Sequence, residues 1–210
     1  MERILIAGAN GTTGKQIVNY LKVSDNFVPV AMVRKEEQVK EFESQGIETV
    51  FGDLEKDLSN VTKGIDKVIF AAGSGGEKVI EVDQEGAKKL IDVSKKSGIK
   101  KFVMLSSMGA DAPEKANELQ EYLKAKHNAD VYLRESGLNY TIVRPGSLNN
   151  EQGNGNIILN AHLDKSGEIP RSDVAKTLIN SLEDDRANNT TFEILEGDTP
   201  IAEAVVHANE

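Results

Sequence analysis

Tyr122 and Lys126 are four residues apart, in the pattern Tyr-x-x-x-Lys, so on a helix they share one face. Free tyrosine has a pKa near ~10 and works at neutral pH only beside a positive charge, which Lys126 would supply. Ser107 follows an apolar run, and we expect it to hydrogen-bond the same substrate oxygen as Tyr122. These residues predict proton transfer at a carbonyl or hydroxyl group. The alternative is that Tyr122 packs with its hydroxyl in solvent and Lys126 extends to the surface.

The sequence around this pair favours a helix that packs on a sheet. We expect a helix from Glu114 to Glu135, whose apolar positions repeat at helical spacing together with the pair: Leu119, Leu123 and Leu133. A lysine in such a stripe is costly unless it is paired or opens into a cleft. The pattern therefore favours a functional position for Lys126.

A glycine-rich turn directly follows the apolar run from Ile4 to Ala7, with the spacing Gly-x-x-Gly-x-x-Gly. In such a turn the first glycine permits tight bending, the second lets the backbone approach a pyrophosphate, and the third lets helix and strand pack closely. The free N–H groups at the start of the next helix attract phosphate. The turn predicts a dinucleotide site, and the alternative is a turn without a ligand. The residues concerned are Gly8, Asn10, Gly11, Thr12, Thr13 and Gly14.

The end of the second apolar run indicates which dinucleotide binds. An NAD site places an acidic residue there, whereas this run ends in Arg34 and Lys35. Two cations suit a 2′-phosphate, and an arginine can hold it with two hydrogen bonds. We therefore expect NADP rather than NAD, although Glu36 and Glu37 follow at once. The alternative is that both cations only solvate a loop.

Further cofactor contacts are expected after the later strands. Asp53, followed by Leu54, is placed to accept a hydrogen bond from the adenine amino group, or else it is a turn carboxylate. Other predicted contacts are Ala71, Ala72 and Gly73 along the cofactor, Pro145 beside the nicotinamide, and Lys126 on the nicotinamide ribose. We expect Arg144 to be a structural ion-pair partner. The three histidines lack the spacing of a metal site, so no metal is predicted.

Apolar runs alternate with amphipathic segments through the first two-thirds of the chain. Apolar runs separated by helices indicate a parallel sheet covered on both faces, so we expect a three-layer, doubly wound α/β fold with strand order about 3-2-1-4-5-6. The expected strands are 4–7, 27–33, 47–51, 66–72, 101–105 and 140–143, and the expected helices include 36–45 and 77–96.

The last quarter of the chain is too short for a second domain, so we expect one domain over residues 1–210. The segment from Asn149 to Gly167 reads as a loop with a short strand at Ile157 to Leu159. We expect residues 149–170 to form a small substrate-side loop region. Beyond it we expect a helix capped by Ser172 and running to about Glu183, a late extra strand from Thr191 to Leu195, and a helix at 201–208.

The composition excludes several classes of protein. The chain has 210 residues, a net charge of −9 and no cysteine, which excludes disulfides, thiolate metal sites and a cysteine nucleophile. Nucleic acid and anionic membranes are unlikely partners for so acidic a chain. The first apolar run is too short for a signal peptide, so we expect a cytoplasmic protein. The predicted helices 77–96 and 114–135 could pair in a homodimer, which nothing in the sequence requires.

Taken together, these motifs resemble an atypical short-chain dehydrogenase/reductase of the NAD(P)-binding, epimerase/dehydratase-like group, related to NmrA-like proteins. The resemblance rests on the glycine turn, Gly52-Asp53-Leu54, Ser106-Ser107, Tyr122 to Lys126 and the run Ser136 to Gly146. It implies a Rossmann fold that usually binds NADP. The Ser107, Tyr122 and Lys126 pattern is kept, but Asp83 stands in the region where the family's catalytic asparagine is expected.

Three functions follow as expectations from the motifs and the resemblance. The first is an NADPH-dependent reductase of a small carbonyl or quinone-like substrate. The alternative is a regulator that senses NADP without turnover, as in NmrA-like proteins. Sugar-nucleotide epimerase or dehydratase activity is disfavoured, because the large C-terminal substrate domain of the extended epimerases has no counterpart in this chain.

Overall fold

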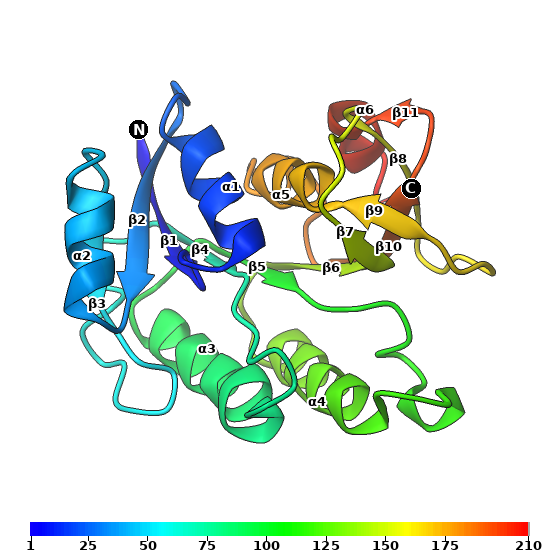
Figure 1. Cartoon of the computed structure of the whole chain (residues 1–210), viewed down its shortest axis with the longest axis horizontal. Coiled ribbons are helices and arrows are strands. Elements are labelled where there is room, and N and C mark those ends of the chain that lie inside the picture. Colours follow the sequence, from blue (N-terminus) through cyan, green and yellow to red (C-terminus); the bar gives the residue numbers. More distant parts are fainter. Residues whose placement is uncertain (210) are drawn as a thin grey trace.

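A computed structural model describes residues 1–209 as a sheet of nine strands between two layers of helices (Figure 1). The strands are β1 (Glu2–Ala7), β2 (Phe27–Val33), β3 (Glu48–Phe51), β4 (Lys67–Phe70), β5 (Lys101–Leu105), β6 (Tyr140–Pro145), β7 (Ser147–Asn149), β8 (Asn156–Asn160), β9 (Glu168–Pro170), β10 (Thr190–Glu196) and β11 (Thr199–Pro200). The helices are α1 (Thr12–Leu21), α2 (Glu36–Glu43), the π-helix η1 (Val79–Gly86), α3 (Ala87–Lys96), the 3₁₀-helix η2 (Pro113–Lys115), α4 (Gln120–Glu135), α5 (Arg171–Asn180) and α6 (Ile201–Val206).

The strand order confirms the predicted doubly wound topology. The sheet runs β3-β2-β1-β4-β5-β6, and all five pairings within this part are parallel. The expected late strand, β10, extends the sheet parallel to β6. Two more strands, β8 and β11, then continue the sheet with antiparallel pairings. The direction of winding reverses between β1 and β4, where open α/β sheets bind ligands at the carboxyl ends of their strands.

Successive side chains of a strand point to opposite faces of the sheet, and each face has its own hydrophobic core. On β1, Ile4 and Ile6 pack with α1, α2 and α5, whereas Leu5 and Ala7 pack with α3 and α4. Both faces of the strand are therefore buried, which explains why β1 reads as continuously apolar. Figure 1 shows α1 and α5 on one side of the sheet and α3 and α4 on the other.

Two predicted helices are shorter or less regular than expected. The helix predicted from Glu114 begins only at Gln120, after the short turn η2 that starts at Pro113. Leu119 adopts a left-handed conformation with φ 59° and is 70% exposed, so its place on the buried stripe was predicted wrongly. The helix predicted from Glu77 begins at Val79 and is a π-helix up to Gly86. A Cβ added to Gly86 would lie 2.7 Å from the Cβ atom of Leu54.

The C-terminal part also differs from the prediction in detail. Two short strands, β7 and β9, form a separate parallel pair in and beside the segment expected to be a loop. Helix α5 is capped by Pro170 rather than Ser172 and ends at Asn180. The Ser172 hydroxyl instead accepts a hydrogen bond from the N–H of Gly153 at 3.1 Å. Ser172 thus lies in the first turn of α5 and holds the loop at Gly153 instead of capping the helix.

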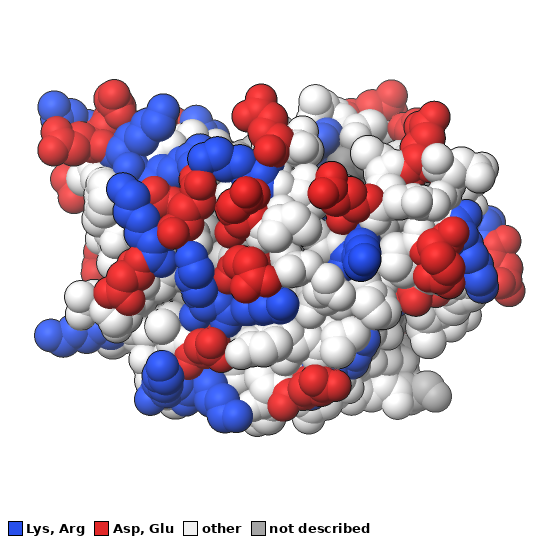
Figure 2. Space-filling view, turned by 90° about the horizontal axis from the view of Figure 1, so that it is seen from below, with Lys and Arg blue, Asp and Glu red and all other residues white. Residues whose placement is uncertain are grey.

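The surface seen from below carries α3 and α4. Figure 2 shows Lys and Arg beside Asp and Glu across this face, in a mixture of both signs. Among residues 1–209, no helix has both the length and the apolar character needed to span a bilayer.

Candidate functional site

A cavity of about 830 Å³ opens at the carboxyl ends of the central strands. Its wall is formed by the loops that follow β1, β2, β3, β4 and β5, together with residues of α1, α2, η1, α4, β7 and α5. Most of the predicted site residues therefore meet in one place. Four of them, all within the described chain, lie outside the lining of the cavity: Gly14, Lys35, Ser107 and Pro145.

The glycine turn has the tight geometry expected of a dinucleotide cradle. Gly8 has φ +88°, and a Cβ on it would lie 2.6 Å from the backbone of Ala72. A Cβ on Gly14 would lie 2.1 Å from the carbonyl oxygen of Gly8, so Gly14 serves packing rather than the lining. Gly11 caps α1 and offers no side chain to the free N–H groups of Thr12 and Thr13. Both threonines line the cavity, so the turn fits a diphosphate.

The part of the cavity that is lined by residues after β2 contains the cation expected there. Arg34 is exposed, donates its backbone N–H to Gln38 at 3.0 Å and, within residues 1–209, makes no ion pair. Lys78, from the loop before η1, also lines this region and is bound to Glu55 at 2.7 Å. Its charge lies close enough to that of Arg34 for the two to repel. Lys35 lies outside the lining, where it precedes α2.

Asp53 is a turn carboxylate, which is one of the two roles that the sequence left open, and its contact with adenine stays a prediction. It lines the cavity together with Leu54. Its Oδ1 atom also accepts the backbone N–H of Glu55 at 3.1 Å, which makes it a turn carboxylate. The second oxygen, Oδ2, lies 3.7 Å from Lys56 Nζ. The Asp53 carboxylate therefore shapes the turn and also borders the cavity.

Asp83 connects the loop after β4 to the lysine of the Tyr-x-x-x-Lys pair. Its Oδ2 atom accepts hydrogen bonds from the backbone N–H and the hydroxyl of Ser74, at 3.0 and 2.8 Å. Its Oδ1 atom lies 3.3 Å from Lys126 Nζ and makes no hydrogen bond to any residue from 1 to 209. Asp83 is 1% exposed, so this carboxylate is held in a dry environment beside the cavity.

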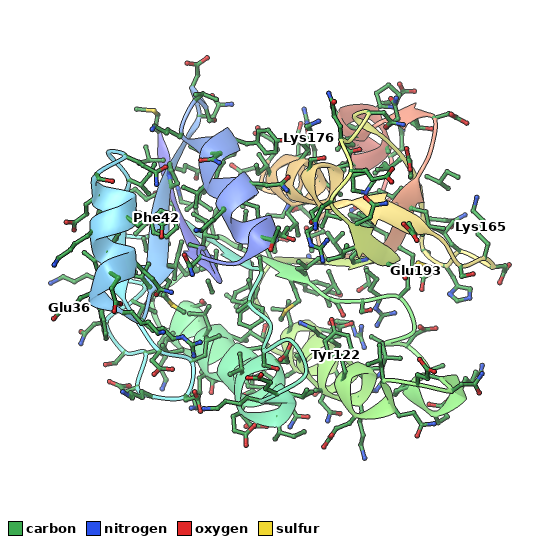
Figure 3. All side chains as sticks on the ribbon, viewed as in Figure 1. Glu36, Phe42, Tyr122, Lys165, Lys176 and Glu193 are labelled. Atoms are coloured by element: carbon green, nitrogen blue, oxygen red, sulfur yellow. The ribbon has the colours of Figure 1, made fainter. Side chains whose placement is uncertain are left out.

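Tyr122 and Lys126 share one face of α4, as their spacing predicts, and both line the cavity. Figure 3 labels Tyr122, whose side chain comes from α4. Lys126 is 3% exposed, and its Nζ donates to the carbonyl oxygen of Leu105 at 3.4 Å. The Nζ atom also lies 5.6 Å from the centre of the Tyr122 ring and 5.9 Å from that of Phe70. The ammonium group is thus buried between two aromatic rings, a carbonyl and Asp83, all of which attract a positive charge.

Ser106, rather than Ser107, is the serine that lines the cavity. Ser106 is 3% exposed, and its hydroxyl donates to Asp130 Oδ2 at 2.9 Å. The hydroxyl of Ser107 donates to the carbonyl of Met108 at 3.2 Å. Arg144 holds the same Asp130 oxygen through Nε and Nη2, at 3.0 and 2.9 Å, which agrees with its predicted structural ion pair. Burial raises the pKa of the Asp130 carboxyl group.

The loop region that we predicted on the substrate side does not line the cavity. No residue from 149 to 170, a segment that the structure describes in full, lines the cavity. The lining there comes from the two flanking residues, Leu148 and Arg171. Arg171 is held in place by the carbonyl of Leu148 at 3.2 Å and by Asn150 Oδ1 at 2.9 Å. No motif marks these two residues, and the only signal in the sequence is their position, after β6 and at the start of α5.

One histidine lies nearer to carboxylates than its place in the sequence suggests. Donor atoms of Asp111, His162 and Glu193 lie within 4.8 Å of one another. Glu193 is buried, and its Oε2 atom accepts the backbone N–H of Leu163 at 2.6 Å, while Asp111 lies 3.9 Å from Arg144. These contacts account for the cluster as ion pairing between loops. The expectation that the protein holds no metal stays a prediction.

Several residues at the site could not be singled out from the sequence. Five of these residues belong to no motif, and only folding brings them to the cavity or to the residues that line it. They are Gln38, Lys78, Asp130, Leu148 and Arg171. The choice of Ser106 over Ser107 follows from which side of β5 each residue occupies as the strand ends. The sequence places Asp83 in the region of the catalytic residues, but it does not indicate the contacts of Asp83 with Ser74 and Lys126.

Comparisons with known proteins agree with this geometry. The profile of a protein family described as NAD(P)H-binding matches residues 8–185, a range that contains the whole lining of the cavity. YhfK of Bacillus subtilis (strain 168), which is named an uncharacterized sugar epimerase, is 44% identical over 211 residues, covering 97% of this chain and 98% of YhfK.

Two solved structures show the same fold over nearly the whole chain. A Bacillus halodurans protein, described as an NAD-dependent epimerase/dehydratase, has a TM-score of 0.93 and 42% identity, covering 98% of this chain and 99% of its own. The oxidoreductase ylbE of Lactococcus lactis has a TM-score of 0.87 and 32% identity, covering 97% of this chain and 94% of its own.

Proposed function

Because the chain belongs to the NAD(P)H-binding family of atypical short-chain dehydrogenases/reductases, we propose that it is an NADPH-dependent reductase of a small carbonyl or quinone-like compound. One observation carries the proposal. Tyr122 and the buried Lys126 line the same cavity as the glycine turn, so a proton donor and a dinucleotide cradle face one space. A purely structural tyrosine and lysine would not need this arrangement.

The preference for NADPH is supported by the part of the cavity around Arg34, where we place the adenosine of the cofactor. Arg34 is exposed at the cavity and carries no partner carboxylate within the described chain, so its guanidinium is available for a 2′-phosphate. Lys78 adds a second positive charge nearby, although Glu55 partly offsets it. The start of α1 would hold the diphosphate, and Lys126 the nicotinamide ribose.

The side chains support a simple division of labour in the reduction. When bound, the dinucleotide supplies a hydride to the carbonyl carbon of the substrate. The Tyr122 hydroxyl gives its proton to the carbonyl oxygen, so that the C=O group becomes an alcohol, and solvent returns a proton to the tyrosinate. Lys126 stabilises that tyrosinate by its charge, and Asp83 and the Leu105 carbonyl hold the lysine in place.

The test is a comparison of two tyrosine variants. Tyr122→Phe should lower turnover of a carbonyl panel by roughly 10²- to 10⁴-fold, measured as loss of NADPH absorbance, with the NADPH dissociation constant unchanged by calorimetry. Tyr20→Phe is the matched control, because Tyr20 is an exposed residue of α1 outside the cavity lining. Turnover by Tyr122→Phe equal to that of the wild-type protein would overturn the assigned chemistry.

A second candidate is a protein that binds NADP as a signal without turnover. It is favoured by one contact: Asp83 offsets the positive charge of Lys126 on which the activation of Tyr122 depends. This candidate predicts micromolar or tighter NADPH binding, no NADPH consumption across the same panel, and partner binding that depends on the redox state of the nucleotide. Epimerase activity on a nucleotide sugar is less well supported, because residues 149–170 contribute nothing to the cavity lining.

A further inference from the structure

A buried chain of hydrogen bonds runs inward from the wall of the cavity. Ser106, at the wall, donates to Asp130 Oδ2 at 2.9 Å. Arg144, on β6, donates to the same oxygen through Nε at 3.0 Å and Nη2 at 2.9 Å. All three side chains are at least nine-tenths buried, and Asp130 is not exposed at all. Asp130 and Arg144 are thus shielded from bulk solvent, and Ser106 is the member of the chain that lines the cavity.

The direction of the Ser106 hydrogen bond is fixed by this crowding. Three donors converge on Asp130 Oδ2, and a carboxylate oxygen offers about two lone pairs, so this atom has no room for a proton of its own. If the carboxyl group takes up a proton, the proton goes to Oδ1, which makes no hydrogen bond to residues 1–209. In either charge state the serine is the donor and Oδ2 the acceptor.

A serine hydroxyl has a single proton, and here it is committed to Asp130. Ser106 lines the cavity, and its hydroxyl can therefore offer a ligand there only lone pairs. A carbonyl oxygen also presents only lone pairs, so Ser106 cannot hydrogen-bond the substrate carbonyl before Tyr122 protonates it. This differs from the role that the sequence suggests for a serine at this point, which was to donate to the substrate carbonyl.

We propose that Ser106 is a specificity-determining residue that accepts a hydrogen bond from a hydroxyl or N–H group on the carbon next to the substrate carbonyl. The inference rests on the proposed reductase function and names its substrate class, carbonyl compounds with an adjacent donor, of which α-hydroxyketones are the simplest. Adjacency follows from the chain: Lys126 Nζ is bound to the Leu105 carbonyl, and Ser106 is the next residue. The donors at Tyr122 and Lys126 and the acceptor at Ser106 thus belong to the lining of the same cavity.

The size of the preference follows from burial. A substrate without the donor leaves the Ser106 oxygen facing the carbonyl unpaired in a nearly dry site, which should lower kcat/KM by roughly 10- to 100-fold. Hydroxyacetone and methoxyacetone form a suitable pair of probes. Both carry an electron-withdrawing oxygen beside the carbonyl, but only hydroxyacetone can donate a hydrogen bond.

The kinetic test compares both ketones in the wild-type protein and in Ser106→Ala. The wild-type protein should prefer hydroxyacetone by the factor given above, and Ser106→Ala should reduce the ratio of the two kcat/KM values to near one. Ser107→Ala should retain the wild-type ratio, because the Ser107 hydroxyl is bound to the Met108 carbonyl outside the cavity lining. Because each ratio is internal to one protein, a general loss of activity does not change it.

A binding test keeps the inference separate from the proposed function. Ligand-observed NMR with the NADP⁺-loaded protein should show stronger binding of hydroxyacetone than of methoxyacetone, and Ser106→Ala should abolish the difference. A binding preference without any turnover would reject the reductase function but support the role of Ser106. Equal binding and equal turnover of the two ketones by the wild-type protein would overturn the inference, and that comparison needs no variant.

Discussion

The Oδ1 atom of Asp83 lies 3.3 Å from the Nζ atom of Lys126, and both side chains are almost fully buried beside the cavity. The pair is close to neutral as a unit, so Lys126 acts on Tyr122 with only part of its charge. Asp83 also holds Ser74 through its other oxygen, so it fixes the loop after β4 at the same time. Asp83 is therefore a positioning residue whose effect can be separated into charge and geometry.

Asp83→Asn removes the charge and keeps an acceptor for Ser74. Without the carboxylate, the charge of Lys126 is no longer offset, so the negative charge that Tyr122 develops as it gives up its proton should be better stabilised. The kcat for carbonyl reduction should therefore rise by up to roughly tenfold. Glu81→Gln, at an exposed site on the same π-helix, is the control. An unchanged kcat in Asp83→Asn would show that Asp83 does not tune the pair.

Arg34→Ala tests the selection of the cofactor. Loss of a charge-assisted hydrogen bond to a 2′-phosphate should weaken NADPH binding by about 10- to 100-fold and leave NADH binding nearly unchanged. Lys35→Ala should change NADPH binding much less, because Lys35 lies outside the cavity lining. Calorimetric titration with both nucleotides measures the two effects. Equal losses for NADPH and NADH in Arg34→Ala would contradict the assignment.

Two glycines of the turn should fail in different ways. Gly14→Ala places a Cβ 2.1 Å from the Gly8 carbonyl oxygen and should cost about 3 kcal/mol or more in the free energy of unfolding. Gly11→Ala meets only one contact, at 3.3 Å, and its φ of −72° suits alanine, so the fold should hold while dinucleotide binding weakens. Urea unfolding and NADPH titration separate the outcomes. A stable Gly14→Ala variant would show that the helix can move away from the strand.

Lys101 lies on β5 at the opposite end from the cavity and makes stability depend on pH. Burial, and then the charge of Lys67, lower the pKa of Lys101 to about 8. Between about pH 8 and pH 10.5 the unfolded chain keeps this proton and the folded chain releases it, so the free energy of unfolding should rise with pH in that window. The rise should be about 3 kcal/mol at most and absent in Lys101→Met.

Urea unfolding at pH 7 and pH 10 checks this expectation in the wild-type protein, in Lys101→Met and in Lys96→Met. Lys96 is exposed on α3, so its substitution should leave the wild-type pH dependence in place. If the wild-type protein and Lys101→Met changed in parallel with pH, the lysine would hold its proton through its hydrogen bonds to the carbonyls of Glu183 and Arg186.

The sequence by itself determined the six parallel strands from β1 to β6 and their order in the sheet. Strands such as Phe27–Val33 and Lys101–Leu105 could be bounded correctly because their apolar pattern reflects burial on both faces, which is a local property. The glycine turn and the Tyr-x-x-x-Lys face were also readable, because backbone conformation and helical spacing depend on near neighbours. The start of α4 was not, since Pro113 and the left-handed Leu119 break a pattern that periodicity alone continues.

Only the tertiary structure decided which polar groups meet. Asp83 is 43 residues from Lys126 in the chain, and Asp130 is 24 from Ser106 and 14 from Arg144. Such pairs are set by how the crossover helices lie on the sheet, and no spacing in the sequence encodes them. A buried side chain must find a partner, but which partner it finds depends on distances that exist only after folding. The path of the chain thus sets the hydrogen-bonding character of the cavity wall, while the sequence motifs indicate where that wall lies.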